Sequence, residues 1–72
     1  MTDMIEGFSY LLGYLEDQCH SALNEANSRS STGDLVGSRY HLGRSDSYAH
    51  AAQELQNVIR IMESQINTLN GE

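Results

Sequence analysis

The sequence predicts an all-α fold: an antiparallel two-helix hairpin with a polar connector, assembling into a homo-oligomeric helical bundle. Three observations predict it. Two segments of similar length carry apolar or small residues at alternating spacings of three and four, a single polar stretch separates them, and each apolar stripe is wider than one neighbouring helix can cover. With 72 residues, the chain is expected to form one small domain spanning residues 1–72.

The first helix is expected over about residues 3–26. Its seam, the row of residues expected to face the other helix, consists of Ile5, Phe8, Leu12, Leu15, Cys19, Ala22 and Ala26. This spacing is an unbroken a/d heptad pattern, and a strand pattern of period two does not fit it. Asp3 followed by Glu6 is typical of a helix start.

The second helix is expected over about residues 45–70, with Ser45 as its N-cap and Gly71 as its stop. Its seam consists of Tyr48, Ala52, Leu55, Ile59, Met62, Ile66 and Leu69. Two helices of similar length joined by one connector favour an antiparallel hairpin.

Self-association is expected because further apolar residues flank both seams, at Met4, Leu11, Leu23, Val58 and Ile61. Exposed apolar surface of this kind usually marks an interface. A homodimeric four-helix bundle or a larger assembly would cover it. The predicted core and oligomer residues are Ile5, Phe8, Leu12, Leu15, Leu55, Ile59, Met62 and Ile66.

The connector is expected over about residues 27–44, where serine, threonine and glycine dominate. Residues 27–33 are predicted to form a mobile loop. Asp34 could cap a short turn, but the polar residues Ser38 and His41 indicate that the second seam ends near Tyr48.

Charge excludes several classes of partner. The chain carries 10 acidic side chains against four arginines and no lysine, a net charge of −6. A nucleic-acid binder needs a basic stripe, and an acidic surface repels anionic membranes, so neither partner is expected. No apolar run could cross a membrane. The acidic N-terminus differs from a signal peptide, and the single cysteine provides no internal disulfide, so we expect a cytoplasmic protein.

A possible anion site precedes the predicted second helix, at Arg39, His41, Arg44 and Ser45. Arginine forks and helix N-terminal amides together bind phosphate or carboxylate groups. Gly43 would allow close approach of the backbone. The alternative is that the arginines pair with acidic residues such as Asp34 and remain solvated. The segment lacks the lysine of a P-loop.

A possible partner-binding face lies opposite the first seam, at Glu6, Tyr10, Tyr14 and Asp17. Tyr10 and Tyr14 are one helical turn apart and are expected to touch. Tyrosines are common anchors of protein interfaces, so this face could dock on a basic protein surface. The alternative is that the tyrosines pack on the connector or on another copy of the chain.

Catalytic and metal chemistry find little support in the sequence. Its soft ligands are Cys19, His20, His41 and His50, and no two of them have the spacing of a zinc site. Cys19 falls in the seam, and His50 with Glu54 is expected to form a surface pair. We therefore expect no enzyme, no metal and no cofactor.

The combination of small size, acidic helices and exposed tyrosines resembles the small acidic proteins that phages and other mobile elements use against host machinery, including anti-CRISPR-type inhibitors. This resemblance implies a protein that binds and inhibits or adapts another protein in the host-cell cytoplasm. One alternative is an oligomeric sponge that sequesters an anionic nucleotide signal through Arg39 and Arg44. Another alternative is a structural component of a phage particle.

Overall fold

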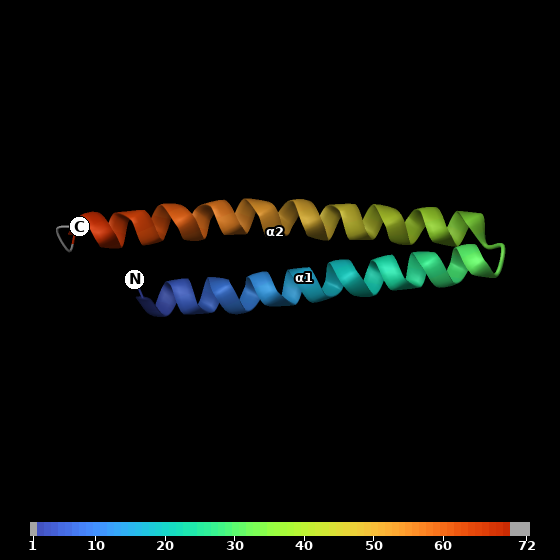
Figure 1. The fold of residues 1–72 in the computed structure, drawn as a ribbon, viewed down its shortest axis with the longest axis horizontal. Helices are drawn as coiled ribbons and strands as arrows, with labels where there is room; N and C mark the ends of the chain where they lie inside the picture. The colour runs from blue at the N-terminus through green and yellow to red at the C-terminus, as the bar shows by residue number, and fades with distance from the viewer. Residues whose placement is uncertain (1, 70–72) are drawn as a thin grey trace.

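Two long helices packed side by side form the whole fold of the computed structural model, which describes residues 2–69. Helix α1 (Thr2–Ser31) and helix α2 (Leu35–Leu69) run antiparallel and are joined by one tight turn (Figure 1). The all-α hairpin predicted from the sequence is therefore confirmed. Within the described residues, neither helix contains a stretch long and apolar enough to cross a membrane.

The turn between the helices consists of Thr32, Gly33 and Asp34. Gly33 has a φ of +84°, a left-handed conformation that favours glycine. The amide of Gly33 donates to the carbonyl of Ser30 at 3.1 Å, and the amide of Asp34 donates to the carbonyl of Arg29 at 2.8 Å. These two bonds are those of a Schellman motif, which ends a helix at a left-handed residue.

Asp34 also begins α2. Its Oδ1 accepts a hydrogen bond of 2.9 Å from the amide of Gly37, as an N-cap side chain does. One residue therefore completes the C-terminal motif of α1 and caps the N-terminus of α2. This double role explains why so short a segment can reverse the chain.

The predicted connector over residues 27–44 is wrong. Helix α1 continues to Ser31, and α2 begins at Leu35, well before the predicted start at Ser45. Ser38 and Ser45 are buried and His41 is half-buried, so the second seam does not end at Tyr48 but continues towards the turn at the same spacing of three and four. The two serines fit these positions because their side chains are small, although they are polar.

Side-chain size changes along the contact between the helices. Near the turn the buried residues are small: Ala22, Ala26, Ser38 and Ser45. Towards the termini the larger residues Ile59 and Met62 are buried, while the other predicted core residues are half-buried: Ile5, Phe8, Leu12, Leu15, Leu55 and Ile66. Among the described residues, no large side chain is completely buried. The hairpin alone therefore has a thin core.

Candidate functional site

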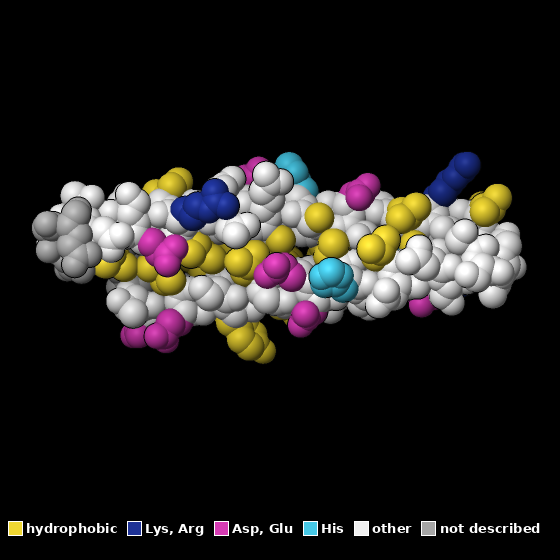
Figure 2. All heavy atoms as spheres, viewed as in Figure 1, with side chains coloured by type: hydrophobic (Ala, Val, Ile, Leu, Met, Phe, Trp, Pro, Cys, Tyr) yellow, Lys and Arg dark blue, Asp and Glu magenta, His cyan; other side chains and the backbone are white. Residues whose placement is uncertain are grey.

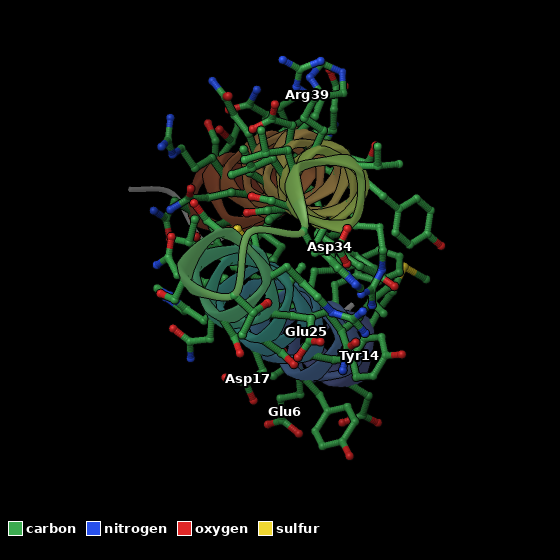
Figure 3. All side chains as sticks on the ribbon, turned by 90° about the vertical axis from the view of Figure 1, so that its right-hand side faces the viewer. Glu6, Tyr14, Asp17, Glu25, Asp34 and Arg39 are labelled. Carbon is green, nitrogen blue, oxygen red and sulfur yellow. The ribbon has the colours of Figure 1, made fainter. Side chains whose placement is uncertain are left out.

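The outer surface of α1 presents the four residues of the predicted partner-binding face, called here the tyrosine–carboxylate face: Glu6, Tyr10, Tyr14 and Asp17. Tyr10 is 84% exposed and Tyr14 is 51% exposed. Figure 3 shows Glu6 and Asp17 pointing away from α2, with Tyr14 at one side of the hairpin. A shallow depression runs between the two tyrosines at Gly13, where the helix has no side chain.

The carboxylates of this face have no cationic partner within the described part of the chain. The ion pairs seen there involve Glu25, Asp34 and Glu54, not Glu6 or Asp17. Their charge is therefore turned towards solvent without local compensation. A face with two exposed aromatic rings and unpaired carboxylates is suited to bind a surface that carries arginine or lysine.

The predicted anion site is not assembled as the sequence suggested. Ser45 lies inside α2, so no helix N-terminus offers free amides there. Its side chain is buried against α1, where its Oγ lies 3.3 Å from Sγ of Cys19. Arg44 donates to Nδ1 of His41 at 2.8 Å, and its guanidinium lies 5.9 Å from the centre of the Tyr48 ring. Arg39 is exposed and points away from α1 (Figure 3).

Two arginines nevertheless share one surface feature on α2. Arg39 and Arg44 line a wide, shallow depression together with Tyr40, Gly43, Ser47 and Tyr48. Ser45 and His41 are not part of its lining. The depression pairs cationic groups with aromatic rings, but no backbone amide at a helix start contributes to it.

The arginine that pairs with Asp34 is Arg29, at the end of α1. Its guanidinium binds Glu25 at 2.9 Å and Asp34 at 3.2 Å. The hydrogen bond from Arg29 lowers the pKa of Glu25, and the amide of Gly37 together with Arg29 lowers the pKa of Asp34. The two carboxylates in turn raise the pKa of Arg29. This cluster braces the turn, and its two carboxylates compensate the charge of Arg29.

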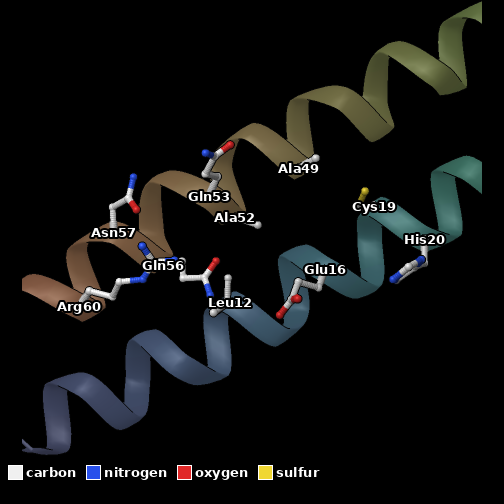
Figure 4. Close-up of a pocket in the computed structure, with 10 residues that line it drawn as sticks. All are labelled: Leu12, Glu16, Cys19, His20, Ala49, Ala52, Gln53, Gln56, Asn57 and Arg60. Atoms are coloured by element: carbon white, nitrogen blue, oxygen red, sulfur yellow. The ribbon is translucent and has the colours of Figure 1, made fainter. Parts of the chain in front are cut away.

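A groove between the helices was not anticipated from the sequence (Figure 4). It measures about 450 Å³ and is open to solvent, with Cys19 and Ala52 at the contact between the helices. Its remaining lining residues are Leu12, Glu16, His20, Ala49, Gln53, Gln56, Asn57 and Arg60. Ala49 beside Ala52 was the available signal, since two small residues on one side of a seam leave space.

Reactive side chains lie apart from one another. Cys19 is half-buried in the seam, and His50 lies 3.6 Å from Glu54 on the surface of α2. Within residues 2–69, no three histidine, cysteine or carboxylate side chains gather into a group that could hold a metal ion.

Comparisons of the chain with protein families, curated proteins and solved structures found no match.

Proposed function

We propose that this protein is a small helical interaction module that binds a basic surface of another protein and thereby inhibits or adapts it. The observation that carries this proposal is the tyrosine–carboxylate face, where Tyr10 is 84% exposed beside carboxylates that have no cationic partner among residues 2–69. Tyrosine buries a large area in a complex at a small entropic cost. The charges favour rapid encounter with a basic partner.

We propose further that the hairpin works as a homo-oligomer in the cytoplasm. Apolar side chains beside the seams stay exposed in the single chain, among them Met4, Leu11, Val58 and Ile61. Packing copies together would cover these residues, while the outward carboxylates Glu6 and Asp17 would remain available to a second protein.

Photo-crosslinking in the source cell tests the partner-binding proposal. A photoreactive residue replaces Tyr10, and a matched control carries the same residue at Val36, which is also exposed but lies on α2. We expect one defined protein to be crosslinked from position 10 and not from position 36. The adduct should disappear when Glu6 and Asp17 are both replaced by arginine. Equal labelling from both positions, or an adduct that survives the charge reversal, would contradict the proposal.

A second candidate function is capture of an anionic nucleotide in the depression lined by Arg39, Arg44, Tyr40 and Tyr48. The observation that favours it is the placement of two arginines beside two aromatic rings. Calorimetric titration with a panel of nucleotides tests it. Binding should be lost in Arg39→Ala and Arg44→Ala, and heat that persists in both variants would refute this site.

A further inference from the structure

The single chain exposes more surface than a globular monomer of the same mass. Its accessible area is 5238 Å². A globular monomer of 8.0 kDa exposes about 4450 Å². The excess of about 800 Å² equals the area that each partner typically contributes to a standard protein interface. The surplus surface of one hairpin is therefore large enough for one specific partner.

The two sides of the hairpin, to either side of the seam, differ in charge. One side, called here the polar side, faces the viewer in Figure 2, where acidic, arginine and histidine side chains spread over the helices. It carries the groove of Figure 4 and, by helical position, the charged residues Glu6, Glu16, Arg39, Asp46, Arg60 and Glu63. A surface with this many charges is a poor core for an interface.

The opposite side, called here the uncharged side, is apolar over its open half, away from the turn. On this side of α1, the first charged residue counted from the N-terminus is Glu25. On this side of α2, the only charged residue after Arg44 is Glu54. Figure 3 places Tyr14 at its edge. The side is made of Met4, Leu11, Tyr14, Gln18, Ala51, Val58 and Ile61, all but Gln18 exposed.

We propose that a second copy of this chain covers the uncharged side, with both turns at the same end and a two-fold axis parallel to the helices. This inference depends on the self-association proposed above and specifies its surface and orientation. In this arrangement α1 of each copy packs against α2 of the other. The polar side and the carboxylates of Glu6 and Asp17 remain in solvent.

The register of the hairpin supports this orientation. The contact between Cys19 and Ser45 sets the two at one level along the axis. Counting from this pair, Leu11 lies within two residues of the level of Ala51, and Met4 within two residues of the level of Val58, about 3 Å in each case. Rotation about a two-fold axis parallel to the helices leaves the height of every residue along that axis unchanged. It therefore places Leu11 and Met4 of one copy near Ala51 and Val58 of the other, with the exposed Glu54 beside Leu11.

The same register pairs polar residues nearer the turn, where Gln18 meets Arg44 of the second copy. Arg44 has no carboxylate within 4 Å among the described residues of its own chain. Its guanidinium donates to His41 and retains further donors. A glutamine oxygen of the second copy can accept one of them.

The opposite orientation, with the turns at the two ends, matches poorly. If two hairpins overlap along their whole length in this orientation, each end of α1 lies beside the opposite end of α1 in the second copy. Met4 then comes level with Arg29 of the second copy, and Leu11 falls between Gln18 and Glu25. The apolar side chains of one copy would then cover the ion pair of Arg29 and Glu25, which removes this half-exposed pair from water without offering it a new partner.

Two matched substitutions test the face. Leu11→Glu places a charge on the uncharged side, and Leu23→Glu places the same charge on the polar side of the same helix. The two leucines are similarly exposed, 43% and 39%, so the fold should tolerate both changes. Circular dichroism checks that each variant remains helical. By size-exclusion chromatography with light scattering, we expect a dimer for the unaltered chain and for Leu23→Glu, and a monomer for Leu11→Glu.

A dimer lost in Leu23→Glu but kept in Leu11→Glu would overturn the assigned face and leave self-association intact. A dimer unaffected by either substitution would likewise overturn the face. A chain that is monomeric at every concentration would overturn both. The crosslinking experiment at Tyr10 is independent of all these results.

A distance measurement tests the orientation. A spin label is attached at Ser30→Cys near the turn, in a Cys19→Ala background, and the distance between labels in the dimer is measured by pulsed electron paramagnetic resonance. Turns at the same end place the labels within the width of two packed helical layers, roughly 30 Å or less. Turns at opposite ends separate them by about 40 Å or more. The shorter distance is expected, and the longer one would refute the orientation.

Discussion

Replacing Gly33 by alanine is the sharpest test of the turn. Gly33 has a φ of +84°, and a Cβ built there meets no atom within 4 Å, so any penalty comes from the backbone alone. A non-glycine residue in the left-handed region costs about 1–2 kcal/mol. Alanine also restricts the unfolded chain, which stabilises by roughly 0.4–1 kcal/mol. We expect Gly33→Ala to lower the free energy of unfolding by about 1 kcal/mol.

Gly13→Ala is the matched control. Gly13 lies inside α1 with helical φ, and a Cβ there also meets no atom within 4 Å. The same chemical change should stabilise the hairpin by about 1 kcal/mol, because alanine favours a helix over glycine by this amount. The two variants should therefore differ by about 2 kcal/mol, with opposite signs relative to the unaltered chain.

Thermal unfolding followed by far-ultraviolet circular dichroism, at one fixed chain concentration, measures both effects. A difference of 1 kcal/mol shifts the Tm of a domain of this size by about 4–8 °C. The Tm of Gly33→Ala should fall and that of Gly13→Ala should rise. If Gly33 belonged to a long mobile connector, alanine there would be neutral or stabilising. An unchanged or raised Tm for Gly33→Ala would thus refute the three-residue turn.

Three further outcomes follow from the packing and the charges. The free energy of unfolding, measured with urea, should fall as the pH drops below about 4.5, because folding lowers the pKa values of Glu25 and Asp34 and protonation breaks their ion pairs. A double variant, Glu25→Gln with Asp34→Asn, should flatten this part of the pH curve. Ile59→Ala, at a residue only 8% exposed, should destabilise the hairpin by about 2–3 kcal/mol in the same assay, whereas Val36→Ala, at a residue 82% exposed, should not. Ala26→Leu should cost about 1–3 kcal/mol by overpacking, and an unchanged stability would show that the helices do not approach closely there.

The helices could be predicted from the sequence where seam residues are large and apolar. Phe8, Leu12, Ile59 and Met62 have the heptad spacing of a packed helix, and the structure contains helices at these positions. Physical size and hydropathy agree there, so the pattern is unambiguous. The exposed face with Tyr10 followed from the same periodicity, since its residues fall opposite the seam.

The connector could not be predicted because size and hydropathy disagree near the turn. Ser38 and Ser45 interrupt an apolar pattern but fit a close contact between helices, where alanine and serine occupy nearly the same space. The serine run before Gly33 also remains helical, with the Ser31 hydroxyl donating to the carbonyl of Asn27 at 3.0 Å. Composition indicated a loop, whereas hydrogen bonds within the helix accommodate these side chains. The expected contribution of helix N-terminal amides to the anion site was wrong for the same reason, because it required a helix start at Ser45.

The shortness of the turn has a consequence for how the chain folds. Ala26 and Ser38, which flank it, are separated by few residues, whereas Ile5 and Ile66, which line one depression, come near each other only after nearly the whole chain has been brought together. Closing a small loop loses little entropy, and the loss grows with loop length. Folding should therefore start at the turn and proceed towards the termini, with a low contact order and a correspondingly fast rate. Substitutions beside the turn should then mainly slow folding, and those near the termini should mainly speed unfolding.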